Sequence, residues 1–326
     1  MKKGVARLKM FGLLLLKLVW LLAIVGVFLF LFSAIICGAG GTVGFIDTEF
    51  AISGLIVCVV LMPITHIGFK KSYIKVFVDG VLKAELPGCQ YQMGGGFDKN
   101  TIDSMFVLVE PGNMYTSEDM LSGEYKGVRF QMADATVKNS VREHLYGDKY
   151  VNKLYKHFEG RMIILDSPIN APKPVYVYSY EFEHRAAGRY NKYMSSETND
   201  RVFGDIFDVL VQQGGSAKIV LNDRVKAALK QLYQKYNNIG VRFDNNRIFM
   251  AINTKEDLFD WSVKRGMTFK KEIETVNKQI SVIKDFVDLI YGYDNDEIGN
   301  EKITTDDNIE LNNNQDKELS DDLLWR

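Results

Sequence analysis

The sequence has few of the residues from which disulfide frameworks and catalytic centres are usually built. Its only cysteines are Cys37, Cys58 and Cys89, and no two of them have CxxC spacing, which argues against a disulfide framework or a zinc site. The four histidines show no HExxH or paired-ligand spacing. No GK[ST] or GxGxxG pattern surrounds the glycines of 94–97, so this stretch is interpreted as a flexible joint. We therefore predict no catalytic, cofactor-binding or metal-binding residue, and an enzyme is the less favoured class.

A strong excess of charge is also missing. The chain has a formal net charge of −1, but residues 292–326 hold eleven acidic and three basic side chains, a net −8, so residues 1–291 carry +7. This charge is too mild and too dispersed to predict a nucleic-acid partner. Residues 292–326 are rich in Asn and Asp with few apolar residues, which predicts an acidic disordered tail. The final "LSDDLLWR" (319–326) is either a docking peptide or, as is favoured, part of a solvated tail.

Two long apolar runs are the strongest pattern in the sequence. They cover about 18–37 and 51–69, and roughly twenty apolar residues in a helix are enough to cross a bilayer. Pro63 and His66 weaken the end of the second run. The first run is longer than the ~7–15 residues of a signal-peptide core, so cleavage is the less favoured interpretation. Residues 1–70 are therefore predicted to form a transmembrane helical hairpin.

Basic residues flank both runs and predict their orientation. Five Lys or Arg side chains lie within residues 1–17, and Lys70, Lys71 and Lys75 follow the second run. The intervening segment has neither Lys nor Arg. The positive-inside rule then predicts a multi-pass plasma-membrane protein with both termini in the cytoplasm. The alternative, a buried or re-entrant second segment, would place the following domain outside.

Residues 71–291 are predicted to form a cytoplasmic α+β domain. The first part combines a helix that ends at Pro87-Gly88 with several strand patterns. We expect a helix over 71–88, a strand over 104–112, strand–turn–strand over 123–138, and strands over 161–168 and 173–184. Tyr176, Tyr178 and Tyr180 alternate along the last of these. They are either a binding platform or, as is favoured, a half-buried sheet face.

Residues 201–253 predict a strand, a helix and a hairpin. The helix covers 221–237, with Asn222 or Asp223 as its N-cap and an apolar stripe on one side. The hairpin covers 239–253, with its turn at 244–246. This order of elements predicts a mixed or antiparallel sheet.

A long C-terminal helix is predicted over 269–290. Its apolar residues recur in alternating steps of four and three, as in a coiled coil. The residues in this pattern are Phe269, Ile273, Val276, Ile280, Ile283, Val287 and Ile290. Phe286 widens the stripe, which favours a helix packed on its own sheet. Self-assembly into a homo-oligomer through this helix remains the alternative.

The sequence resembles a bacterial family known as domain-of-unknown-function family 3137 (DUF3137). A first block carries a Ser and an apolar pair, then Tyr-x-x-Glu-Asp and two spaced glycines. The matching residues are Ser104, Met105, Phe106, Tyr115, Glu118, Asp119, Gly123 and Gly127. A second block matches a Phe-x-Gly-Arg strand at Phe158, Gly160 and Arg161, with Met162 where Thr is usual.

A third block of the resemblance covers residues 200–253. Its matching apolar positions are Phe203, Phe207, Val209, Ala217, Leu221 and Leu232. Lys218 stands where the family often has Arg, so no role of that Arg is carried over. The resemblance implies two N-terminal membrane spans and no known activity.

Tyr115, Glu118, Asp119 and Gly123 form the candidate functional loop. Neighbours on a strand point to opposite faces, so Glu118 and Asp119 would converge on one ligand only in a turn. No second acidic cluster completes a metal site, which usually needs three or more ligands. The favoured role is structural, with Ser117 or Asp119 accepting local hydrogen bonds and Gly123 supplying an unusual backbone angle.

The preferred function is a membrane-anchored cytoplasmic module that binds or scaffolds a partner. Its expected partners are the lipid bilayer and an unidentified protein. The first alternative is a membrane-tethered hydrolase or metal-dependent enzyme that uses Glu118 and Asp119. The second is self-assembly through the 269–290 helix.

Overall fold

The structure is a computed structural model that describes residues 3–39, 47–105, 107–108, 112–146, 149–182, 193–195, 200–259 and 268–292. Two compact units can be distinguished, one within 1–84 and 261–276 and the other within 85–260 and 277–306. Each unit is considered by itself. The predicted tail beyond Gly292 lies outside the described residues, and the predicted division into domains stays a prediction.

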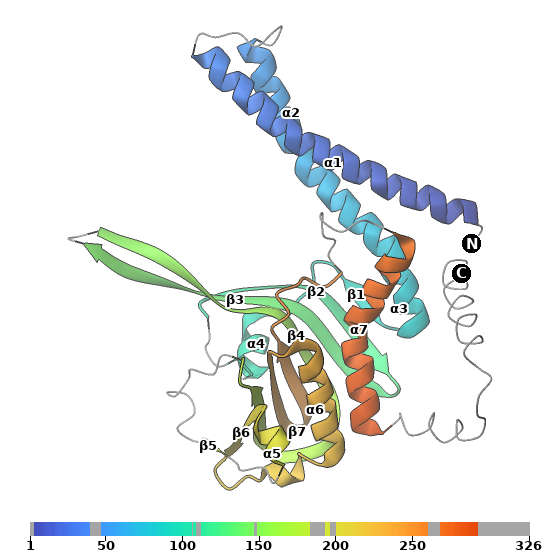
Figure 1. The fold of residues 1–326 in the computed structure, drawn as a ribbon, viewed down its shortest axis with the longest axis vertical. Helices are drawn as coiled ribbons and strands as arrows, with labels where there is room; N and C mark the ends of the chain where they lie inside the picture. The colour runs from blue at the N-terminus through green and yellow to red at the C-terminus, as the bar shows by residue number, and fades with distance from the viewer. Residues whose placement is uncertain are drawn as a thin grey trace. The chain divides into compact units, whose positions relative to one another are not determined.

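The first unit contains the apolar helices. Helix α1 covers Lys3–Gly38 and α2 covers Thr48–Tyr73, and both are long and apolar enough to cross a membrane. They lie side by side (Figure 1) and approach closely at small residues. A Cβ on Gly26 would meet Cys58 Sγ at 2.6 Å, and one on Gly54 would meet the Phe30 ring at 2.5 Å. Small residues at such crossings are typical of helix pairs in membranes.

Helix α2 continues through Pro63, so the proline does not end the span. Few of the described apolar side chains of α1 and α2 are buried. This exposure suits lipid and disfavours the alternative of a buried second segment. A π-helix, Ile74–Val78, and α3, Asp79–Glu85, continue from α2 without a break. The helix predicted over 71–88 is therefore confirmed, with Pro87 and Gly88 just beyond its end.

The second unit is built on an antiparallel sheet. Its described strands are β1 (Gln90–Gln92), β2 (Met114–Tyr125), β3 (Val128–Tyr146), β4 (Lys149–Ser179), β5 (Tyr193–Ser195), β6 (Phe207–Gln212) and β7 (Ile239–Ile252). They follow the order β1-β2-β3-β4-β6-β5, and β7 also pairs with β4. Every pairing is antiparallel, so the predicted α+β class with such a sheet is confirmed. The long β4 contains the strand predicted over 161–168 and residues 173–179 of the strand predicted over 173–184, whose residues 180–182 form a turn and bend.

Helices cover parts of both faces of this sheet. The short helices are α4 (Lys99–Met105), α5 (Arg201–Gly204) and a 3₁₀ turn (Ala217–Ile219), and the long ones are α6 (Asp223–Tyr236) and α7 (Phe269–Tyr291). Over the second unit, α6 and the C-terminal part of α7 lie side by side in front of the strands (Figure 1). On the other face, α4 packs on a core of alternate strand residues. This core contains Phe97, Ile102, Met105, Val107, Ala133, Ala135, Val137, Phe158, Met162, Tyr176, Tyr178, Phe182 and Ala251.

Two predicted elements are wrong. The segment predicted as a strand over 104–112 begins inside α4, which Asp98 caps by accepting a 2.6 Å hydrogen bond from the Thr101 amide. Its residues 107–108 form no strand, and the others beyond Met105 up to 111 lie outside the described residues. The hairpin predicted over 239–253 is instead the single strand β7. Both halves of β7 pair with β4, because β4 is long enough to accept them in sequence.

The other helix predictions are confirmed. Asn222 caps α6 by accepting a hydrogen bond from the Val225 amide, and α7 ends one residue beyond the predicted 269–290. The apolar stripe of α7 is buried within the chain from Val276 to Ile290. This burial favours the core-helix interpretation over a free oligomerisation seam.

The positions of Tyr176, Tyr178 and Tyr180 decide between a binding platform and a buried sheet face. Tyr176 and Tyr178 are buried and stacked, with ring centroids 6.1 Å apart, whereas Tyr180 lies in a turn beyond the strand. The two buried rings belong to the core beneath α4. They are therefore a buried sheet face, and an exposed tyrosine platform is not present at these residues.

Candidate functional site

The predicted loop at Glu118 and Asp119 is in fact part of β2. The strand continues through both residues, and the pairing with β3 shifts between Glu118 and Leu121. Two residues of β2 therefore oppose one residue of β3, which is a β-bulge. The bulge places Asp119 in the left-handed region, with φ 59°, and buries it completely, while Glu118 is exposed. The two carboxylates do not converge on one ligand.

Asp119 is held by an aromatic hydroxyl. The Tyr91 hydroxyl donates a 2.5 Å hydrogen bond to Asp119 Oδ1, and the Tyr91 ring packs edge-on against Phe259 at 5.2 Å. Burial, followed by the hydrogen bond to Asp119, raises the pKa of Tyr91 far above its ordinary value. Tyr91 is therefore a neutral donor, and the pair joins β1 to the β2 bulge. This bond joins residues 28 apart in the sequence, so it differs from the local turn or cap hydrogen bond that the sequence predicts for Asp119 or Ser117.

The remaining predicted site residues also serve packing. Tyr115 donates a 2.7 Å hydrogen bond to Asp103 of α4. Gly123 has no left-handed backbone angle, so that part of the prediction is wrong. A Cβ on Gly123 would lie 2.3 Å from Cys89 Sγ, so the residue is small because the chain before β1 passes close to it.

A buried charged pair lies next to this region, on β3 and β4. Asp134 and Arg161 are direct partners in the strand register, with Oδ1 and Nε 3.9 Å apart. Arg161 is only 2% exposed. Burial raises the pKa of Asp134 to about 7, although the Leu258 amide and Arg161 both lower it. Arg161 belongs to the Phe-x-Gly-Arg block of the family resemblance, whereas no sequence pattern pointed to Asp134.

A loop after β7 covers the buried pair. The Leu258 amide donates to Asp134 Oδ2, and the Phe259 amide donates a 3.1 Å hydrogen bond to Gln279 Oε1 on α7. Phe259 is buried with φ 54°, which is unusual for a bulky side chain. Asp119 and Asp134 are therefore enclosed beneath side chains of other segments.

These arrangements do not support the enzyme alternative. Among the described residues, no group of three or more His, Cys, Asp or Glu side chains could hold a metal ion. Glu118 is exposed and Asp119 is enclosed, so the two cannot share one substrate. Asp119 contacts β1, Tyr115 contacts α4, and Gly123 lies against the segment before β1.

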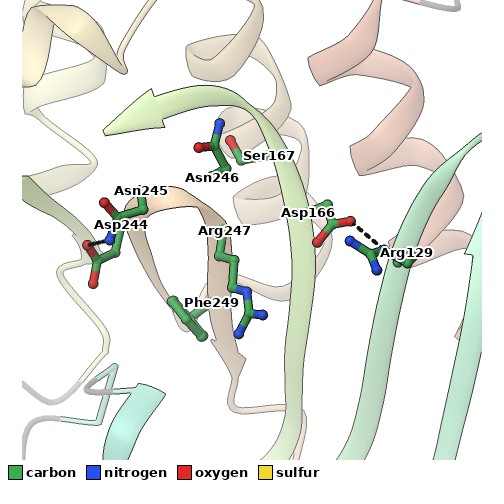
Figure 2. Close-up of a pocket in the computed structure, with 8 residues that line it drawn as sticks. All are labelled: Arg129, Asp166, Ser167, Asp244, Asn245, Asn246, Arg247 and Phe249. Carbon is green, nitrogen blue, oxygen red and sulfur yellow. Dashed lines mark hydrogen bonds and ion pairs between the residues drawn. The ribbon is translucent and has the colours of Figure 1, made fainter. Parts of the chain in front are cut away.

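An open cleft lies where β4 and β7 bulge together. Between Asp166 and Ala171, β4 has four unpaired residues, and β7 has one residue between their partners Arg247 and Asn245. The cleft has a volume of about 620 Å³. Figure 2 shows its lining, which consists of Arg129, Asp166, Ser167, Asp244, Asn245, Asn246, Arg247 and Phe249. A smaller hollow of about 340 Å³ adjoins it and reaches Gly123.

Most charges of this cleft are paired. Arg129 Nε lies 2.9 Å from Asp166 Oδ2, across neighbouring strands (Figure 2). Asp244 pairs with Arg242, which also donates to the carbonyls of Ser104 and Met105 at the end of α4. Arg247 is exposed and makes no ion pair with a described residue. The cleft is therefore polar and open, with one guanidinium facing solvent.

A two-stranded arm is an exposed feature of the second unit. β3 and β4 pair from Lys138–Lys156 to Tyr146–Lys149, beyond the last buried pair of Val137 and Phe158. This segment, residues 138–157, is called the arm, and it extends away from the other strands (Figure 1). A two-stranded ribbon without a core is only marginally stable in water.

Large apolar side chains are exposed along the arm. Tyr146 is 89% exposed, Tyr150 53% and Leu154 55%. The Arg142 guanidinium lies over the Tyr150 ring, 4.4 Å from its centroid, and His144 meets the same ring edge-on. Direct register partners share a face, so Leu154, Arg142 and Tyr150 line the same side of the ribbon. This side combines apolar area with positive charge.

The arm is also basic. Residues 138–157 hold five Lys or Arg and two acidic residues, a net +3. This segment was not predicted from the sequence, in which residues 150–155 show no strict alternation of apolar and polar side chains. The exposed ribbon could not be predicted from the sequence, because the local pattern does not show that the neighbouring strands end before residues 138–157.

Comparison with known proteins supports the family resemblance. Residues 144–290 match the family described as "Protein of unknown function (DUF3137)". The crystal structure of the mycobacterial trehalose monomycolate transport factor A, TtfA, is similar at 11% sequence identity, with a TM-score of 0.36. The similarity covers 68% of this chain and 91% of that chain, and at this TM-score it supports no functional inference. No curated protein matches the sequence.

Proposed function

We propose, on the premise that residues 144–290 form a DUF3137 domain, that this chain is a membrane-anchored binding module that engages a protein partner through its β3–β4 arm. The anchor is the α1–α2 pair, inserted in the plasma membrane as a multi-pass hairpin. Both termini and the second unit lie in the cytoplasm. The activity is recognition, and no chemical step is assigned to it.

The arm is the observation on which this proposal rests. Tyr146, Tyr150 and Leu154 expose apolar surface on a ribbon that has no core of its own. Exposed aromatic and apolar side chains clustered on one element mark interaction sites more often than isolated ones do. Tyr and Arg are also enriched among the residues that contribute most to protein interfaces. A partner that covers this side would stabilise both the ribbon and the complex.

Membrane anchoring is supported by α1, α2 and the flanking charges. Few of the described apolar side chains of either helix are buried, and such surfaces are stable only in lipid or against protein. Lys and Arg flank the outer ends of the two helices, and the segment between the helices has none. The positive-inside rule then favours cytoplasmic termini.

Site-specific photocrosslinking in intact membranes tests the proposal. A photoreactive phenylalanine analogue at Tyr150 should capture a second protein, which mass spectrometry then identifies. Ile219, on the 3₁₀ turn, is the matched control position because it is also 53% exposed. Capture at Tyr150 and not at Ile219 is the expected result.

A loop-shortened variant separates the arm from the rest of the domain. Asn139 and Tyr155 are direct partners, so residues 140–154 can be replaced by Asn-Gly, a favoured two-residue hairpin turn. The variant should stay folded and should no longer co-purify with the captured protein. Unchanged co-purification would show that the partner binds elsewhere and would contradict the proposal.

A further inference from the structure

We propose that the acidic C-terminal segment, residues 293–326, docks on the arm of the same molecule and competes there with the partner. This inference rests on the proposed function of the arm and adds its regulation. The segment lies outside the described residues, and its sequence and point of attachment carry the argument together with the surface of the arm.

Charge complementarity is the first reason. The segment from 292 to 326 has a net charge of −8, and the arm has a net charge of +3. Five Lys or Arg side chains of the arm lie within twenty residues of sequence. Opposite charges arranged in this way attract and orient two surfaces before they dock. The attraction falls with added salt, since the Debye length is only about 8 Å at 0.15 M.

Apolar complementarity is the second reason. Leu323, Leu324 and Trp325 form the only run of three apolar residues within 293–326, and Asp321 and Asp322 precede them directly. The arm offers the matching combination, with Tyr150 and Leu154 beside Arg142. Trp325 is suited to this surface because a large aromatic side chain buries much area and also accepts an arginine over its ring.

The attachment point of the segment lies within reach. At the end of α7, Asp288 accepts a 3.0 Å hydrogen bond from Tyr125 and pairs with Lys126 at 2.9 Å, so the segment starts near the β2–β3 turn. From Val128 to Arg142 along β3 is about 45 Å at ~3.3 Å per residue. The thirty residues that precede Leu323 span up to about 100 Å when extended. Repulsion among like charges also extends such a segment.

Docking in this position would limit access to the arm. The partner and the segment would use the same side of the ribbon, so each would lower the apparent affinity of the other. An intramolecular competitor acts at a high effective concentration, set by the length of its linker. Removal of the segment should therefore increase capture of the partner several-fold.

The experiment uses the full chain in nanodiscs of phosphatidylcholine, which has no net charge to compete for the arm. A photoreactive analogue at Tyr150 should crosslink to a peptide from 293–326, in a product with the mass of one chain. The yield should fall at least five-fold in 0.5 M NaCl. It should fall similarly when Asp321 and Asp322 are changed to Asn together with Trp325→Ser, changes that lie outside the described fold. The same analogue at Ile219 is the control.

Three outcomes would overturn the inference: equal crosslinking at Ile219 and Tyr150, a yield that salt does not change, or a product only of dimer mass. The last would mean docking between two chains. Partner capture by chain 1–292 in membranes tests the proposed function separately. Capture of a partner without any crosslink to the segment would refute the inference and leave the function in place. A crosslink to the segment, with no partner captured by either chain, would refute the function and with it the competition, and would leave only the docking.

Discussion

Asp119 shows how a residue with a catalytic appearance can serve the fold. Its left-handed backbone, with φ 59°, is one that Asp and Asn tolerate better than most residues, and its carboxylate accepts the Tyr91 hydroxyl. Asp119→Ala should cost about 2–4 kcal/mol of unfolding free energy, from backbone strain and from the partly buried Tyr91 hydroxyl, which would lose its acceptor. Asp119→Asn retains both properties and should cost about 1 kcal/mol. Urea unfolding of the detergent-solubilised chain, followed by circular dichroism, measures both values.

Glu118 is the matched control for this prediction, since it is the exposed neighbour on the same strand. Glu118→Ala should change stability by no more than about 0.5 kcal/mol. If Asp119→Ala left stability intact while abolishing partner capture, the structural role assigned to the bulge would be wrong. That result would restore a direct functional role to the 117–123 stretch.

Asp134 predicts a dependence of stability on pH. Burial raises its pKa to about 7 in the folded chain, whereas an unfolded Asp titrates near pH ~3.9. Between these two values the folded chain holds a proton that the unfolded chain has lost. Stability should therefore fall as pH rises from about 4 to 7, by at most ~1.4 kcal/mol per pH unit from this group.

Asp134→Asn tests this dependence, because the amide retains the shape and can still accept from the Leu258 amide. The variant should lose the part of the pH slope that Asp134 contributes, as measured by urea unfolding at pH 5 and pH 7. Glu118→Gln removes an exposed carboxylate and should leave the wild-type slope. An Asp134→Asn slope equal to that of the wild type would show that Asp134 is already ionised in the folded chain.

At the scale of elements, the sequence predicts helices better than strand pairing. The bounds of α7 and the Asn222 cap of α6 follow from local periodicity and capping, which depend on neighbouring residues. The hairpin over 239–253 was wrong because Asn245 and Asn246 suggested a turn. The burial pattern of β7 instead changes parity between Phe243 and Ile248, as a bulge within one strand requires.

The candidate site was predictable only in part, for a similar reason. The identities of Tyr115, Glu118 and Asp119 follow from the sequence, but the bulge that gives Asp119 its left-handed backbone depends on the pairing of β2 with β3. Asp134 and Arg161 lie on different strands, and only the register between β3 and β4 brings them together. The arm depends on where other strands end. Each of these features is set by tertiary pairing, which local patterns do not contain.

The arm should contribute little to the stability of the domain. Its pairs lie beyond the buried Val137 and Phe158, so its removal exposes no core. Replacement of 140–154 by Asn-Gly should leave the midpoint of thermal unfolding within about 2 °C of the wild type. Circular dichroism of the detergent-solubilised chain measures this midpoint. A loss of cooperative unfolding would mean that the ribbon is part of the folding unit, and partner capture by the variant would then say nothing about binding.

For the whole molecule, orientation in the membrane decides which partners the arm can meet. The basic residues that flank α1 and α2 resist transfer across the bilayer, whereas the segment between the helices carries none. In a chain whose three cysteines are changed to Ser, a membrane-impermeant maleimide should label Thr42→Cys on intact cells. It should label Ile219→Cys, an exposed position on the second unit, only after permeabilisation. Labelling of Ile219→Cys on intact cells would place the arm outside the cytoplasm and remove the basis for a cytoplasmic partner.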